Sequence, residues 1–182
     1  MRYNNSVEIF IDVALRKTGV LITDNFVPVE HFLVSFKDKL SLDTFEDIEA
    51  HYFYVSELLR DIKRNYSSIN FSVLESDTFG ARRGGYKTKE IMTIARMNWS
   101  HALNKITKIK PKNIIYVPSG TWKKSLLGNS SLKKDEYRRK ILTIANELWG
   151  VNLSEIKNHD ILDAYAIAAY WVKYVGKKKV LW

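Results

Sequence analysis

The segment that most constrains the fold is residues 158–171, a strongly apolar run that carries two acids near its start. Its alanine content, its apolar residues at three- and four-residue spacing and a capping Asn158 predict a helix. Asp160 and Asp163 lie three positions apart, so a helix would project both carboxylates from one face near its N-terminal end. Like charges on a mostly buried helix need compensation, either by solvent and the helix dipole or by a divalent metal ion. The segment alone leaves both explanations open.

Length and composition favour one folded, soluble unit. A chain of 182 residues predicts a single domain over residues 1–182, and its 46% hydrophobic and 13% aromatic content excludes a disordered chain. The sequence has no cysteine, which excludes a disulfide framework and a thiolate zinc site. No apolar run reaches the roughly 18 residues of a membrane helix, and the start shows no signal-peptide pattern. We therefore expect a soluble, cytoplasmic protein.

The positive charge of the chain is concentrated in one segment. The formal net charge is +9, and residues 101–140 hold eleven basic residues against two acids, whereas the rest holds 18 of each sign. The eleven are Lys105, Lys108, Lys110, Lys112, Lys123, Lys124, Lys133, Lys134, Arg138, Arg139 and Lys140. Such a concentration, interleaved with Trp122 and Tyr137, is typical of a surface that binds a phosphate backbone, although a solvated basic face is the simpler alternative.

The order of apolar patterns predicts an α/β fold with the element order βββαβαβαα. Expected strands lie at residues 7–14, 18–23, 27–36, 69–74 and 113–117, and expected helices at residues 42–62, 88–106, 131–149 and 158–171. Ser41 is the expected cap of the first helix. Three strands at hairpin spacing predict an antiparallel meander, and the later alternation predicts strands parallel to the first. The result is a five-stranded mixed sheet with helices on both faces.

Two further acids lie at expected strand ends. Asp12 follows the first strand and Glu75 follows the fourth. Ligands gather beyond the carboxyl ends of parallel strands in such sheets. If these two strands are neighbours, Asp12 and Glu75 meet there.

Several motifs together resemble the RuvC family of Holliday junction resolvases, within the RNase H-like nucleases. They are Ile9-Phe10-Ile11-Asp12 with the Thr18-Gly19 strand, Val73-Leu74-Glu75, the basic segment from Val117 to Gly128 with Leu132-Lys133-Lys134 after it, and Asp160-Ile161-Leu162-Asp163-Ala164. The resemblance covers residues 7–170 in order and spacing. It implies an RNase H-like fold.

The resemblance also implies a metal-dependent endonuclease that resolves four-way DNA junctions. Its carboxylates would be Asp12, Glu75, Asp160 and Asp163, holding two Mg²⁺ ions roughly 4 Å apart, for which Mn²⁺ can substitute. Lys123 would support charge on the phosphate. DNA contacts would come from Phe79, Arg82, Arg83, Lys123, Lys124, Lys133 and Lys134.

The resemblance further implies a homodimer, because a four-way junction has two-fold symmetry and paired nicks need two active sites. The helix over residues 88–106 is the expected dimer contact, since apolar residues surround much of it. Val13-Ala14 stands where the family has Pro-Gly, a divergence that indicates a phage or viral member. His159 is a candidate neighbour of the metal ligands.

Other functions stay open from sequence. The same carboxylates would serve an RNase H-like enzyme that cuts RNA–DNA hybrids or flaps. A non-catalytic nucleic-acid-binding module would keep the basic surface, but retention of all four acids argues against it.

Overall fold

A computed structural model describes residues 3–14, 16–36, 42–76 and 86–176 of the chain. Five strands form one mixed sheet in the order β3-β2-β1-β4-β5. Their bounds are β1 (Tyr3–Asp12), β2 (Lys17–Asp24), β3 (Val27–Ser35), β4 (Tyr66–Ser76) and β5 (Ile114–Pro118). The first three strands make the expected antiparallel meander, and β4 and β5 run parallel to β1. β1 and β4 are neighbours.

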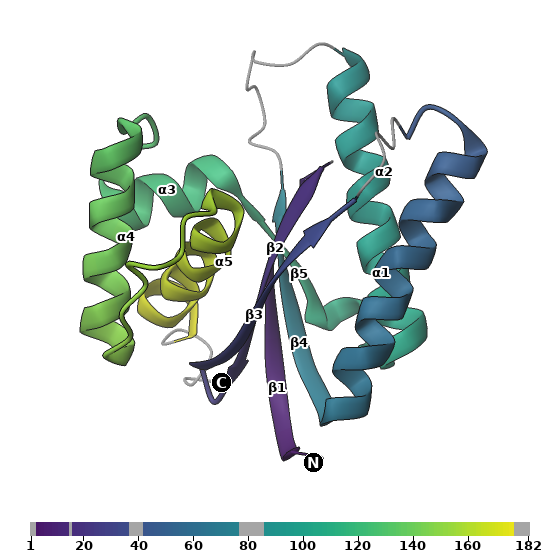
Figure 1. The fold of residues 1–182 in the computed structure, drawn as a ribbon, viewed down its shortest axis with the longest axis horizontal. Coiled ribbons are helices and arrows are strands. Elements are labelled where there is room, and N and C mark those ends of the chain that lie inside the picture. The colour runs from purple at the N-terminus through teal and green to yellow at the C-terminus, as the bar shows by residue number, and fades with distance from the viewer. Residues whose placement is uncertain (1–2, 15, 37–41, 77–85, 177–182) are drawn as a thin grey trace.

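Helices cover both faces of the sheet (Figure 1). One face carries α1 (Phe45–Asn65) and α2 (Tyr86–Ala102), which continues into the π-helical turn η1 (Leu103–Thr107). The other face carries α3 (Ser119–Leu127), α4 (Lys134–Trp149) and α5 (His159–Tyr170), and α5 continues into the π-helical turn η3 (Trp171–Val175). A short 3₁₀ turn, η2 (Pro111–Asn113), precedes β5. The predicted fold class is confirmed.

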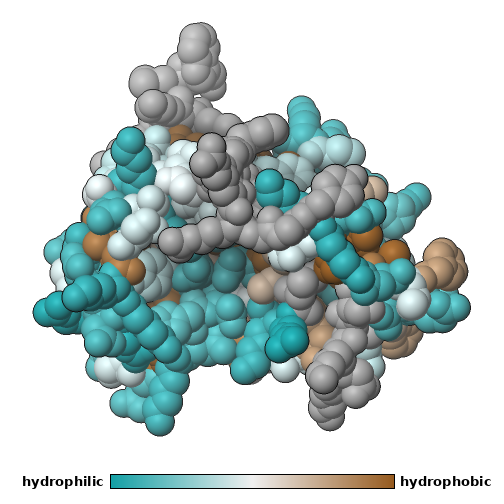
Figure 2. Space-filling view, turned by 90° about the horizontal axis from the view of Figure 1, so that it is seen from above, coloured by the Kyte–Doolittle hydropathy of each residue, from teal (hydrophilic) through white to brown (hydrophobic). Residues whose placement is uncertain are grey.

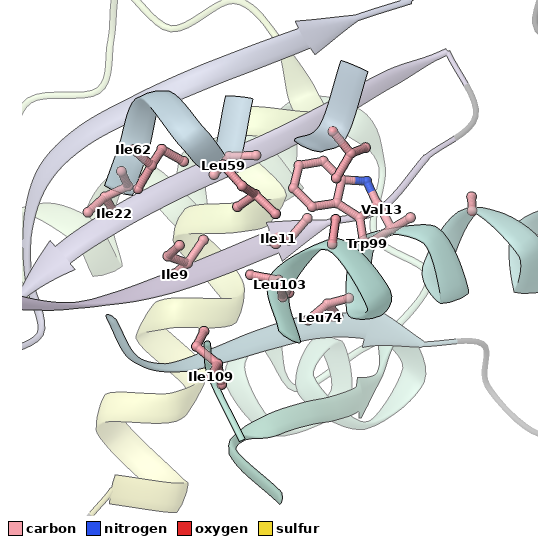
Figure 3. Packing of buried hydrophobic residues seen from close by; sticks show 14 of the residues in the cluster. Ile9, Ile11, Val13, Ile22, Leu59, Ile62, Leu74, Trp99, Leu103 and Ile109 are labelled. Carbon is pink, nitrogen blue, oxygen red and sulfur yellow. The ribbon is translucent and has the colours of Figure 1, made fainter. Parts of the chain in front are cut away.

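The side chains on the two faces of β1 belong to two separate hydrophobic cores. Ile9 and Ile11 pack under α1 and α2, while Phe10 between them packs under α5, as the period of two along a strand requires. Figure 3 shows the first core, with Trp99 and Leu103 of the α2–η1 segment over β1. Because both faces are covered, residues 7–12 of β1 and 18–23 of β2 are all buried, instead of alternating between buried and exposed positions.

Two predicted helix starts were wrong. The first helix is capped by Thr44, whose hydroxyl accepts a hydrogen bond from the Asp47 backbone nitrogen at 3.2 Å. Ser41 lies outside the described residues, and Leu42 is a buried residue ahead of the helix with φ of 51°. The helix expected over residues 131–149 begins at Lys134. Both errors arose because the apolar spacing continues beyond the residues that have helical backbone.

The predicted element order also lacked α3. This nine-residue helix starts after Pro118 and ends at Gly128, which adopts φ of 76°. Its sequence is too short and too polar on most sides to give a clear helical period, so it resembled a basic loop. None of the helices in the described part of the chain combines the length and apolarity needed to span a bilayer.

The expected dimer helix is mainly a core element. Ala95 and Trp99 of α2 are fully buried within the chain, as is Leu103 just beyond it. Met97 faces outward with 63% of its surface exposed. The apolar residues around this segment therefore largely serve the protein's own core, and its role as a dimer contact stays a prediction.

Candidate active site

Strand pairing brings the first two predicted acids together. Ile11 of β1 pairs with Leu74 of β4 in parallel register, so the residues that follow, Asp12 and Glu75, lie side by side at the carboxyl edge of the sheet. Asp12 is 8% exposed. The β1–β4 adjacency confirms the condition under which these two acids were expected to meet.

Helix α5 supplies the third acid, and Gly19 allows the helix to approach. Asn158 caps α5 as predicted, because its side-chain oxygen accepts hydrogen bonds from the backbone nitrogens of Asp160 and Ile161. The first turn lies so close to β2 that a Cβ atom at Gly19 would be 1.9 Å from the Asp160 carbonyl oxygen. Gly19 itself pairs with Asp12 across the β1–β2 ladder. A residue with no side chain therefore sets the start of α5 against the end of β1.

Asp12, Glu75 and Asp163 form a compact carboxylate cluster. One oxygen from each lies within 4.8 Å of the others. Burial raises the pKa of Asp12 well above its usual range, and the nearby charges of Glu75 and Asp163 raise it further. Burial likewise raises the pKa of Glu75 and of Asp163, although the Lys123 ammonium opposes this in both. Three crowded, poorly solvated carboxylates of this kind favour the binding of a cation.

Helix α3 brings a cation and a hydrogen-bond donor to the cluster. The Lys123 ammonium lies 3.4 Å from Asp163 Oδ2 and 4.8 Å from the centre of the Trp122 ring. The indole Nε1 of Trp122 donates to Glu75 Oε2 at 3.2 Å. Burial alone would lower the pKa of Lys123, but the charges of Asp163, Glu75 and Asp12 outweigh burial and raise the pKa. Lys123 is therefore a charged partner of the cluster, whereas the contact of Trp122 with Glu75 was not predicted.

Helix α4 contributes a second unpredicted partner, Tyr137. Its hydroxyl donates a short hydrogen bond to Asp163 Oδ1, and burial followed by the Asp163 charge raises the pKa of Tyr137. Its ring lies 6.3 Å from the His159 ring. In the sequence Tyr137 was noted only as an aromatic within the basic segment, and its position three residues after Lys134 on one helix was the signal that it shares this lysine's face.

A pocket of about 340 Å³ opens beside the cluster. It is lined by Lys123, Leu127, Asn129, Ser130, Leu132, Lys134, Tyr137, His159 and Asp163. Lys134 and His159 therefore line the same pocket as Asp163, and the DNA role of Lys134 stays a prediction. Figure 2 looks onto this edge of the sheet, where the described surface on the side of α3 and α4 is mostly hydrophilic.

The other predicted site residues lie outside the compact carboxylate cluster or outside the described part of the chain. Asp160, one turn before Asp163, is not part of the compact cluster, although its charge raises the pKa of Asp12 and of Asp163. Lys124 on α3 and Lys133 at the cap of α4 are exposed. Phe79, Arg82 and Arg83 lie outside the described residues.

Solved structures share this architecture. RuvC from Thermus thermophilus matches with a TM-score of 0.61 and 14% identity, over 94% of this chain and 96% of that one. The same protein in complex with a Holliday junction substrate matches with a TM-score of 0.64 and 14% identity, over 95% and 96%. The chain has the RuvC fold. The yeast mitochondrial Holliday junction resolvase Ydc2 also matches, with a TM-score of 0.60 and 13% identity over 99% of this chain and 85% of that one.

No protein-family model matches the chain, and no curated protein matches it significantly. At 13–14% identity, the likeness to these solved structures is one of fold. The predicted resemblance is confirmed at the level of the fold.

Within this RuvC fold, the donor set of the cluster fits a hard divalent cation. All three close side chains offer carboxylate oxygens, which are the ligands that Mg²⁺ and Mn²⁺ prefer, and no cysteine competes for a softer metal. The acids also carry more negative charge than Lys123 can neutralise. A cation at Asp12, Glu75 and Asp163 would remove this imbalance.

Proposed function

We propose that this protein is a metal-dependent, structure-selective endonuclease that resolves four-way DNA junctions. The observation that carries the proposal is the meeting of Asp12, Glu75 and Asp163 within 4.8 Å at the carboxyl edge of a RuvC-type sheet. The fold neighbours include a RuvC in complex with a Holliday junction substrate, which supports branched DNA as the substrate class. Residues 1–182 would form one nuclease domain.

The carboxylates are the proposed metal ligands. Asp12, Glu75 and Asp163 would hold Mg²⁺ or Mn²⁺, and Asp160 would complete a set of four acids for two ions. A bound divalent ion supplies an activated water and stabilises charge on the phosphodiester oxygens. Asp12 is buried and Glu75 and Asp163 are partly buried, which limits the screening of these charges by bulk water.

Lys123 is the proposed partner of the scissile phosphate. Its ammonium is 3.4 Å from Asp163 Oδ2. With cations held by the acids, the same ammonium would be able to contact a phosphate oxygen and stabilise the charge that develops there. Trp122 packs against Lys123 and holds Glu75, so α3 acts as one rigid support for both groups.

The DNA path is proposed to follow the basic carboxyl edge. Lys134 lines the pocket beside Asp163, and Lys124 and Lys133 lie exposed at the ends of neighbouring helices. We further propose contacts from Phe79, Arg82 and Arg83, which follow β4 in sequence. The enzyme would act as a homodimer, because paired nicks across a two-fold junction need two active sites.

The decisive experiment is cleavage of labelled four-way junction, flap, linear duplex and RNA–DNA hybrid substrates with Mg²⁺. Wild type should place paired nicks in the junction, and Asp12→Asn should bind it without cutting. Glu49→Gln makes the corresponding acid-to-amide change at an exposed site on α1 and is the matched control, expected to cut like wild type. Metal-dependent cleavage of the flap or hybrid alone would retain the site and overturn the junction assignment. Binding without cleavage of any substrate would overturn the proposal that this protein is a nuclease.

A further inference from the structure

The basic segment is continuous in sequence but divided in the structure. Strand β5 runs from Ile114 to Pro118 through the middle of residues 101–140. The four lysines before β5 therefore lie at the amino edge of the parallel strands, and the seven basic residues after it follow the carboxyl edge. Only the second group adjoins the carboxylate cluster.

Three cations of α1 join the lysines at the amino edge. A pocket of about 450 Å³ is lined by Arg60, Lys63, Arg64, Lys105, Ile106 and Lys108, and we call it the amino-edge basic pocket. All five cations are exposed. Glu57 pairs with Arg60 and Asp61 with Arg64, each one turn back on α1, so two carboxylates face five cations and an excess of three positive charges remains.

The backbone that carries these lysines is anchored. Lys63 Nζ donates to the Ile106 carbonyl at 3.0 Å, which ties α1 to η1. The Asn104 amide donates to the Ile109 carbonyl at 2.9 Å, and Ile109 is buried at 2% exposure. A π-helical turn such as η1 often marks a functional position in helical proteins. Like charges are thus held close together on a fixed frame, which disfavours a merely solvated face and favours an anionic ligand.

The side chains that line the pocket suit phosphate groups. Among the residues that line the pocket there is no aromatic side chain to stack on a base and no carboxylate or amide to read one. Lysine and arginine spread over two elements suit successive phosphates of a backbone.

The amino-edge basic pocket lies far from the carboxylate cluster. Helix α1 ends at Asn65 and β4 begins at Tyr66, whereas Glu75 is nine residues further along the same strand. Nine strand residues span about 30 Å. Figure 1 shows this separation, because α1 ends near the bottom of the view and β1 and β4 run upward from there. One duplex arm lying on the carboxyl edge would not also fill this pocket.

We propose that the amino-edge basic pocket binds the phosphate backbone of a second duplex segment while the carboxyl edge holds the first. The protein would then bridge two stretches of DNA, independently of whether the carboxylate cluster cuts. Binding here is electrostatic and non-sequence-specific.

The test uses the full chain bound to a bead-immobilised four-way junction in Ca²⁺ buffer, washed, and then offered a labelled 30-base-pair duplex. Wild type should capture the duplex. Lys105→Glu/Lys108→Glu should remain on the junction and capture at least five-fold less. In solution, its duplex affinity should have a log–log salt slope smaller by about two. Lys105→Gln/Lys108→Gln should show the same direction with a smaller loss, and melting temperatures check folding.

The comparison variant is Lys133→Glu/Lys134→Glu, which changes the net charge equally at the carboxyl edge. It should be released from the junction instead. Equal duplex capture and an equal salt slope in wild type and Lys105→Glu/Lys108→Glu would overturn the proposal. So would saturable pyrophosphate binding that this variant loses while duplex capture persists, since the pocket would then take a small anion. Failure of cleavage in every variant would count against the proposed nuclease and leave the capture result intact.

Discussion

The Tyr137 hydroxyl donates a hydrogen bond to Asp163 Oδ1, while the Lys123 ammonium approaches the other oxygen of the same carboxylate at 3.4 Å. Tyr137 comes from α4, Lys123 from α3 and Asp163 from α5. Three helices therefore determine the orientation of one acid in the cluster. This makes Tyr137 a positioning residue for a proposed metal ligand.

Tyr137→Phe should weaken Mg²⁺ and Mn²⁺ binding. The ring remains in place, but Asp163 loses the hydrogen bond that orients it, and outer contacts of this type are worth about 10-fold or more in metal affinity. Calorimetric titration of the metal into the protein measures the change. Tyr116→Phe removes a hydroxyl that bonds Ser100 on the outer surface and should bind metal like wild type. Unchanged metal affinity in Tyr137→Phe would show that Asp163 does not depend on the tyrosine.

Lys123→Met should destabilise the metal-free protein by about 1–2 kcal/mol, because the partly buried acids would lose their closest cation. Urea unfolding in EDTA measures this. Saturating Mg²⁺ should restore part of the stability, because the metal replaces the missing charge. The neighbouring Lys124→Met, on the exposed side of α3, should stay within about 0.5 kcal/mol of wild type. Equal unfolding midpoints for the two variants would contradict this role of Lys123.

Asp12→Asn should raise the melting temperature of the metal-free protein. It removes one charge from three crowded, poorly solvated carboxylates, which relieves repulsion from Glu75 and Asp163. The same variant should lose the stabilisation that Mg²⁺ gives wild type, since a ligand is gone. Differential scanning calorimetry with EDTA and with Mg²⁺ measures the melting temperature without metal and the shift that Mg²⁺ causes. A metal-induced shift as large as that of wild type would remove Asp12 from the metal site.

Gly19→Ala should destabilise the fold by about 1–3 kcal/mol, as overpacking does. Its Cβ would collide with the Asp160 backbone carbonyl at 1.9 Å, and backbone cannot move aside as a flexible side chain can. Gly176→Ala is the matched control, because its nearest contact is an ordinary 3.5 Å and its helical φ of −57° suits alanine. Urea unfolding compares them. A Gly19→Ala variant as stable as Gly176→Ala would mean that α5 is less closely seated on β2.

Acidification should weaken the fold through His51. Burial lowers the pKa of His51 to about 4 from an ordinary value near 6.5, so the unfolded chain binds a proton in the interval between them and the folded chain does not. The Asn98 amide points its nitrogen at His51 Nδ1 at 3.1 Å, which disfavours a proton there. Stability from this group is complete above about pH 6.5 and falls, by up to about 3 kcal/mol, as pH drops toward 4.

His51→Gln should flatten that part of the stability profile. Urea unfolding at pH 7, 6, 5 and 4.5 measures wild type and variant in parallel. A wild-type profile that is as flat as that of the variant would exclude His51 as the source of the pH dependence.

Local pattern predicted much of the fold. The strand periods, the Asn158 cap and the acids at strand ends are features of neighbouring residues, and the sheet with helices on both faces followed from their order. Helix α3 was not predicted because a short, mostly polar helix has little apolar periodicity. The start of α1 was predicted wrongly because apolar residues continue at helical spacing before the helix begins. For the candidate site, the sequence led to Asp12, Glu75, Asp163 and Lys123, which the structure brings together. It also led to Asp160, which is not part of the compact cluster.

The sequence by itself determined which residue types stand at the ends of which elements, because propensity, capping and period act over a few residues. The tertiary structure alone decided that β4 lies against β1, that α4 supplies Tyr137 to Asp163, and that β5 divides one basic segment between two edges of the sheet. These are pairings between distant segments. They depend on how both faces of the sheet are buried at once. The spacing of neighbouring residues in the sequence does not contain this information.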